Sequence, residues 1–125
     1  MLLVPLAAVA AVAVMAGPAA ASGAENTRGM TSRASPARPV IAYVTGGSDT
    51  ATVTPIRTAT NTALPPIKVG NANELLETIV VTPDGTTVYV VNELANTVTP
   101  IRTATNTALP PVKVGSLPVA IAITP

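Results

Sequence analysis

Short runs of valine, isoleucine and threonine alternate with turn-forming residues along the chain from residue 40 onward. Runs that are rich in β-branched side chains and bounded by glycine, proline, asparagine or aspartate predict strands rather than helices. The clearest turn signal is Pro83-Asp84-Gly85, because proline presets φ and glycine accepts a positive φ. The pattern predicts an all-β fold with strands at residues 40–43, 52–56, 63–69, 79–81, 87–91, 97–101, 108–114 and 119–123.

The strand pattern is repeated within the chain. Residues 54–66 return unchanged as residues 99–111, and Gly70 returns as Gly115, each 45 positions later. A period of this size is typical of propellers and solenoids. Tyr43 corresponds to Tyr89, 46 positions later, so the loop after Tyr43 has one residue more than its counterpart. The sequence therefore predicts two repeats, at about residues 40–80 and 81–125.

Four short strands joined by turns describe one blade of a β-propeller, which is a four-stranded antiparallel sheet. Pro55 and Pro100 fall inside the third strand of their repeats, where we expect a bulge or a strand end because proline cannot donate to a ladder. The first repeat lacks its first strand, and residues 119–123 begin a new blade. The sequence thus predicts an incomplete ring, with one full blade flanked by two partial blades.

Several landmarks of the second repeat occur in a characteristic order. The segment 89–92 (YVVN) is preceded by 82–85 (TPDG) and followed by 96–98 (NTV), and in this order it resembles the YVTN β-propeller repeat family. The resemblance extends over residues 40–125, although the first repeat has Gly46 where the signature has asparagine. It implies a closed ring of about seven blades, and it says more about fold than about activity.

Two explanations account for an incomplete ring. In the first, the chain is a fragment of a longer propeller, because a repeat array needs about three units to bury a continuous core. In the second, the chain forms a head-to-tail homo-oligomer, in which residues 119–123 of one copy complete the first blade of the next.

Residues 1–21 predict an export signal peptide or an N-terminal anchor. Residues 2–16 are apolar and uncharged, and Ala19-Ala20-Ala21 offers a small-residue cleavage site. The apolar run is short for a membrane span, which needs about 20 residues. Residues 22–39 contain serine, glycine, proline and arginine without apolar periodicity, which predicts a flexible linker. We therefore expect an extracellular or cell-envelope location, with membrane contact only through residues 1–21 if they are not cleaved.

The composition restricts the chemistry that the chain can perform. It has no histidine and no cysteine, which excludes disulfides, thiolate nucleophiles, Ser-His-Asp triads and the commonest zinc ligands. The formal net charge is +1 and only two residues are aromatic, so neither a basic footprint nor a base-stacking platform for nucleic acid is predicted. We expect no cofactor, no metal and no nucleic-acid partner.

Two carboxylates and two arginines are candidates for a site. Glu74 and Glu77 are spaced i, i+3, which on a helical turn places them on one face for acid–base chemistry or cation binding; the alternative is a solvated loop. Arg57 and Arg102 follow the third strand of each repeat at equivalent positions, so in a propeller they ring one face and can contact an anionic ligand. Pairing with nearby acids or plain solvation is the alternative for both arginines.

Asp49 and Glu93 complete the candidate surface, because each lies in the loop after a tyrosine-bearing strand and such loops carry binding residues. The sequence predicts a secreted or surface-associated, non-catalytic binding or scaffold module for a protein, glycan or surface polymer. Two alternatives remain at this point. One is a fragment of a propeller enzyme, since similar propellers occur in lactonase-like hydrolases and reductase-associated domains, and the other is a fragment without independent function.

Overall fold

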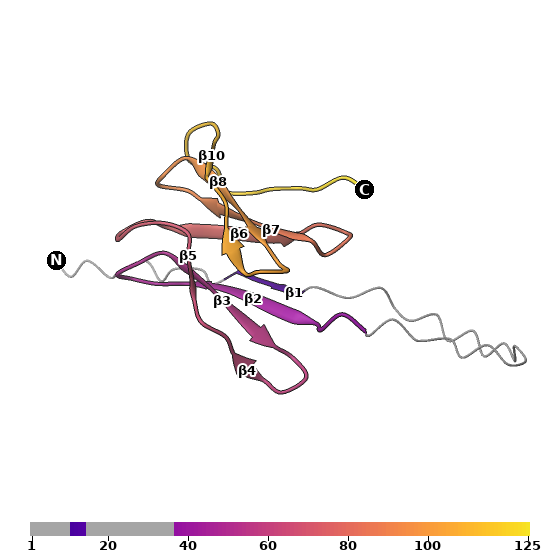
Figure 1. Cartoon of the computed structure of the whole chain (residues 1–125). Coiled ribbons are helices and arrows are strands. Elements are labelled where there is room, and N and C mark those ends of the chain that lie inside the picture. Colours follow the sequence, from indigo (N-terminus) through magenta and orange to yellow (C-terminus); the bar gives the residue numbers. More distant parts are fainter. Residues whose placement is uncertain (1–10, 15–36) are drawn as a thin grey trace, which may run out of the picture.

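The computed structural model describes residues 11–14 and 37–125, and these residues form ten strands and no helix. They are arranged as two antiparallel sheets, as Figure 1 shows. The first sheet contains β1 (Val12–Val14), β2 (Ile41–Gly46), β3 (Thr52–Arg57), β4 (Thr62–Ala63) and β5 (Ile67–Lys68). The second contains β6 (Leu76–Val81), β7 (Thr87–Asn92), β8 (Thr97–Arg102), β9 (Thr107–Ala108) and β10 (Val112–Lys113). The all-β prediction is confirmed for the described residues.

The two sheets have the same strand order and the same register. In the first sheet β2 lies between β1 and β3, with Tyr43 opposite Ala13 on one side and Pro55 on the other. In the second sheet β7 lies between β6 and β8, with Tyr89 opposite Val80 and Pro100. β1 therefore occupies in the first sheet the place that β6 occupies in the second.

The prolines of the third strands do not cause the expected bulge or strand end. Pro55 lies in regular register opposite Tyr43, and its carbonyl accepts a hydrogen bond from the Leu64 N–H at 2.8 Å. The N–H and C=O of one strand residue point to the same side, so the missing donor of Pro55 faces the outer edge strand. That edge is interrupted between β4 and β5, so the proline costs only the one bond to the edge strand that it cannot donate. Pro100 and Leu109 repeat this arrangement, also at 2.8 Å.

The fourth strand of each repeat is broken into two short pieces. β4 and β5 both pair with β3, and Pro65-Pro66 lies between them; β9 and β10 both pair with β8, and Pro110-Pro111 lies between them. A proline pair removes two consecutive donors, which is why the ladder is interrupted at this point. Among the described strands, the pairing with β3 shifts by one residue between β4 and β5, the pairing with β8 does the same between β9 and β10, and β6 shifts against β7 between Leu76 and Ile79.

The chain ends depart from the predicted elements. Residues 11–14 belong to the predicted export segment, yet Val12–Val14 forms β1, and Thr45 N–H donates to the Ala11 carbonyl at 3.2 Å. The other residues of that segment and residues 22–36 of the predicted linker lie outside the described residues. The predicted strand at 119–123 is wrong, because these residues pair with no strand of the described chain.

The core lies between the two sheets and consists of aliphatic side chains and one tyrosine. Tyr43, Val88, Val90 and Ile101 are completely buried, and β6 packs against β1 and β2. The Tyr43 hydroxyl donates to Asn106 Oδ1 at 3.1 Å, which joins the first sheet to the turn between β8 and β9. Burial raises the pKa of Tyr43. Alternate residues of β2 point away from this core, as strand geometry requires.

Candidate functional site

The described charged side chains separate toward opposite ends of the sheets. We call the end where β3 and β8 finish the basic end, because Arg57 and Arg102 are their last residues and Arg38 precedes β2 there. Asp84 also lies at this end, in the turn between β6 and β7. We call the opposite end the acidic end. Its charged residues are Asp49, Glu74, Glu77 and Glu93, together with Lys68 and Lys113.

A cleft of about 480 Å³ opens between the two sheets at the basic end. The first sheet contributes Arg38 and Ile41 to its wall, and the second contributes Gly85, Arg102 and Thr103. The cleft exists because the turn between β6 and β7 and the turn after β8 both reach toward the start of β2. Of the predicted site residues, only Arg102 lines it; Arg57 is exposed at the same end outside the lining.

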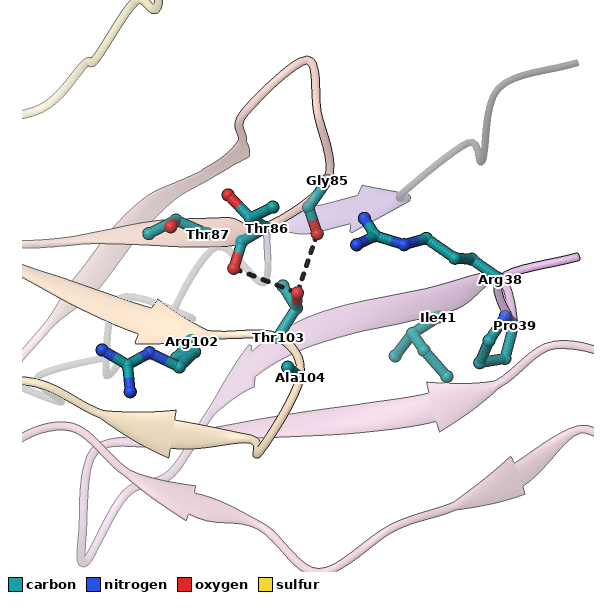
Figure 2. A pocket seen from close by; sticks show the side chains of 9 residues that line it. All are labelled: Arg38, Pro39, Ile41, Gly85, Thr86, Thr87, Arg102, Thr103 and Ala104. Carbon is teal, nitrogen blue, oxygen red and sulfur yellow. Dashed lines mark hydrogen bonds between the residues drawn. The ribbon is translucent and has the colours of Figure 1, made fainter. Parts of the chain in front are cut away.

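Hydrogen bonds hold the two turns of the second sheet together beside this cleft. Thr103 Oγ1 donates to the carbonyl oxygens of Gly85 at 2.8 Å and Thr86 at 3.0 Å, the two contacts drawn in Figure 2. Gly85 has φ of 68°, a value that favours glycine. Arg38 Nη1 donates to the Asp84 carbonyl at 3.1 Å, and this bond joins residues before β2 to the second sheet.

Asp84 fixes the shape of the turn with its side chain. Its carboxylate accepts hydrogen bonds from the Thr82 hydroxyl and from the backbone N–H and hydroxyl of Thr86. These bonds, that from Thr82 first, lower the pKa of Asp84. The backbone bond from Thr86 makes this an Asx turn, in which the aspartate side chain binds the backbone N–H two residues farther on.

The two guanidinium groups of the cleft do not converge. Figure 2 shows Arg38 extending across the opening toward the Gly85 turn, whereas the Arg102 side chain extends away from Arg38 on the other side of Thr103. Two separated cations match a ligand with spaced anionic groups better than a single small anion, which needs its donors aimed at one point. The geometry therefore favours an extended anionic ligand.

Glu74 at the acidic end is bound by amides rather than paired with Glu77. Its carboxylate accepts hydrogen bonds from Asn92 Nδ2 at 2.6 Å and from the Asn71 backbone N–H at 2.8 Å. Burial opposes ionisation of Glu74, but these hydrogen bonds and the charge of Lys68 outweigh it and lower the pKa. Asn92 is almost completely buried at the end of β7, and its Oδ1 accepts from the Ala95 N–H at 3.1 Å. This arrangement is structural, because it fixes the loop before β6 onto β7.

Gly70 is needed for this contact. A Cβ at Gly70 would collide with Glu74 Oε2 and approach Asn92 Nδ2 to 2.9 Å, whereas a Cβ at the equivalent Gly115 meets nothing within 4 Å. Gly70→Ala should therefore displace the Glu74 carboxylate from Asn92 and lower the free energy of unfolding by about 1 kcal/mol, as loss of a hydrogen bond does. Urea unfolding of G70A and of the matched control G115A checks this. Equal stability of the two variants would contradict the described position of Glu74.

Glu77 lies in the irregular part of β6 and faces Glu93. Burial and the neighbouring Glu93 carboxylate raise the pKa of Glu77. Glu74 and Glu77 thus belong to separate environments, and the predicted carboxylate pair on one helical face is not formed. Asp49 lies in the exposed loop after β2, where its Oδ1 accepts from Ser48 Oγ at 3.4 Å.

The raised pKa of Glu77 predicts a pH-dependent effect. Folding favours the protonated form of Glu77. The resulting contribution to stability is complete at pH values below 4.5, the ordinary pKa of a glutamate, and is lost as pH rises through the raised pKa. Glu77→Gln removes the repulsion with Glu93 and should stabilise the fold by about 0.5 kcal/mol at neutral pH. Urea unfolding at neutral and acidic pH should show the gain disappearing in acid. A gain that persists in acid would show that charge is not its cause.

The sequence did not indicate Arg38 or Thr103 as site residues. Arg38 falls in the segment predicted as a linker, and Thr103 is one of many threonines with no distinguishing spacing. Among residues 11–14 and 37–125, no group of three or more acidic side chains lies close enough together to hold a metal ion. In the same part of the chain, no helix has the length and apolar character that crossing a membrane requires.

Comparison of the chain with protein-family models and with curated proteins finds no match.

Proposed function

We propose that the chain is an exported, non-catalytic binding module, whose two sheets are consecutive blades of a β-propeller of the YVTN type. Three observations support this fold assignment: the repeat of 45 residues, the equal register of the two sheets, and their packing face to face. The apolar segment 1–21 supports export. The absence of histidine and cysteine supports a binding role over a catalytic one.

The binding surface of this proposal is the basic end. The observation that carries it is the cleft between the sheets, which has Arg38 on one side and Arg102 on the other. Arg57 extends the positive charge along the same end. The ligand is a surface polymer or glycan with spaced carboxylates, because separated guanidinium groups each bind one carboxylate with charge-assisted hydrogen bonds.

Calorimetric titration of the full chain at low ionic strength tests the proposal. Polygalacturonate serves as the anionic probe and neutral dextran as its uncharged counterpart. We expect binding of polygalacturonate only, weakening with added salt because exposed charges are screened. The double variant R38Q/R102Q should lose roughly ten-fold in affinity. Lys113→Gln, at the acidic end, is the matched control and should bind as the unmodified chain does. Equal loss in K113Q, or unchanged binding in R38Q/R102Q, would refute the proposed surface.

A further inference from the structure

Equivalent faces of the two sheets are covered to different extents. In the second sheet, Val88 and Val90 of β7 point toward the first sheet and are completely buried. Their counterparts in β2 point away from the second sheet, and on that face the neighbouring Val12 and Val14 of β1 are 58% and 57% exposed. The first sheet therefore has an apolar outer face that corresponds to a buried face of the second sheet.

The second sheet has the complementary uncovered face. Tyr43 points into the core, and its counterpart Tyr89 lies on the side of β7 that points away from the first sheet. On this outer face, residues 121–124 line a shallow groove together with Tyr89 and Thr82. In Figure 1 this yellow segment runs on the side of the second sheet opposite the first sheet.

The segment near Tyr89 is held in a defined place. The Leu117 N–H donates to Asn96 Oδ1 at 2.7 Å, and Thr78 Oγ1 donates to the Val119 carbonyl at 2.8 Å. Its sequence from Ile121 to Pro125 is IAITP, which matches IVVTP at residues 79–83, the end of β6 and the turn after it. Residues 121–123 thus resemble the first strand of a sheet and lie on Tyr89 much as β6 lies on β1 and β2.

A hydrogen bond between the sheets has an unused counterpart. The Tyr43 hydroxyl donates to Asn106, whose φ is 50°. The equivalent residues are Tyr89 and Asn61; Asn61 has the same φ of 50° and is exposed on the first sheet. If the outer face of the second sheet of one chain packs against the outer face of the first sheet of another chain, Tyr89 and Asn61 come to lie as Tyr43 and Asn106 do within one chain.

The edge of β2 that β1 occupies shows which kind of sequence can pair there. β1 has the sequence VAV and pairs with Val44, Tyr43 and Ala42, which is the register that residues 79–81 adopt beside β7. Residues 121–123, with the sequence IAI, have the same alternation as VAV of β1 and are apolar like IVV of residues 79–81. The chain's own 121–123 segment lies on the far side of the second sheet from β2, so a second copy is the source that the geometry allows.

We propose that residues 121–123 of a second copy of this chain pair with β2 in place of β1. Ile121 then lies opposite Val44, Ala122 opposite Tyr43 and Ile123 opposite Ala42, and Tyr89 of the donor copy binds Asn61 of the acceptor. In the single chain, β1 pairs with this edge of β2. The edge becomes free when β1 is removed, for example by cleavage of an export signal. This association goes beyond the proposed binding function and does not depend on it.

Disulfide trapping between full chains tests the register directly, because the chain contains no cysteine of its own. One sample carries Val44→Cys and the other Ile121→Cys, and both carry Ala13→Pro, which removes a donor from β1 and weakens its hold on β2. Residues directly opposite in an antiparallel pair are within reach of a disulfide. After mixing and mild oxidation we expect a covalent dimer of the two chains. The mismatched pair, Val44→Cys with Ile123→Cys, should give roughly ten-fold less.

The same samples with alanine kept at position 13 provide the second measurement, which stands even if A13P folds poorly. In them the dimer should form more slowly, because β1 must leave first. Equal yields from the matched and mismatched pairs would overturn the proposal. Absence of the dimer in both backgrounds would also overturn it. So would a disulfide within a single chain that carries both cysteines, because residues 121–123 would then pair with β2 of their own chain.

Equilibrium sedimentation of the A13P chain measures the Tyr89–Asn61 contact. Tyr89→Phe or Asn61→Ala should each weaken association roughly five-fold, as loss of one neutral hydrogen bond does. Because Asn61 and Asn106 have the same positive φ, Asn61→Ala should cost the monomer only the backbone strain, whereas Asn106→Ala, its counterpart between the sheets, should cost that strain and the bond to Tyr43 as well. Association that is insensitive to both Y89F and N61A would overturn the proposed packing.

Discussion

Replacing Tyr43 with alanine should lower the free energy of unfolding by about 3–5 kcal/mol, the largest effect we expect from any single substitution in the chain. Tyr43 is completely buried between the sheets, and no other aromatic side chain contributes to this core. Alanine leaves a cavity that aliphatic neighbours on two rigid sheets cannot fill, and it also removes the bond to Asn106. Urea unfolding of the monomeric chain measures the loss.

Tyr89→Ala is the matched control, because Tyr89 has the same strand position but is only half-buried. It should cost about 1–2 kcal/mol. Tyr43→Phe separates the hydroxyl from the ring and should cost about 1 kcal/mol. Equal losses in Y43A and Y89A would mean that the sheets do not pack through Tyr43.

The second large effect is expected at Asn92. Its side chain is 1% exposed and donates to the Glu74 carboxylate. Asn92→Ala removes a hydrogen bond to a charged group and leaves part of that carboxylate without a donor, which should cost about 2–3 kcal/mol at neutral pH. Asn71→Ala is the comparison: it removes an exposed hydrogen bond from Asn71 Nδ2 to Glu74 Oε1 at 3.2 Å but keeps the bond from the backbone N–H, so the loss should be smaller, about 0.5 kcal/mol.

The loss at Asn92 should also depend on pH. Because the folded pKa of Glu74 is below its ordinary value of 4.5, its contribution is complete above that value and is lost as pH falls through the lowered pKa. The difference in unfolding free energy between N92A and the unmodified chain should therefore shrink in acid. A constant difference across this range would indicate that Asn92 acts through packing rather than through the carboxylate.

Local signals predicted most of the strands. β-branched runs and the Pro-Asp-Gly turn placed β7 and β8 within one or two residues, and the repeat transferred them to β2 and β3. The regular fit of Pro55 was not predicted, because it depends on where the outer edge strand is interrupted. That interruption is set by Pro65-Pro66, ten residues farther along the chain, and becomes visible only once the register is known.

The candidate site was predicted less well than the fold. Arg57 and Arg102 were found because the repeat places them at equivalent strand ends. The spacing of Glu74 and Glu77 left open a carboxylate pair on a helical turn or a solvated loop, and the irregular start of β6 separates the two side chains. Arg38 was missed because its contact with the second sheet depends on a segment distant in sequence. β1 was not predicted either, because it lies in an apolar run whose composition indicates an export signal.

β3 and β8 have the identical sequence TVTPIR, although they belong to different sheets. Either one is chemically able to bond to β2 or to β7. During synthesis β2 meets β3 before β8 has emerged from the ribosome, so the order of translation resolves the ambiguity. A denatured chain that is diluted from urea presents both partners at once. Crossed pairing then becomes a kinetic trap, and recovery of the native chain by refolding in vitro is expected to lag behind its yield from biosynthesis.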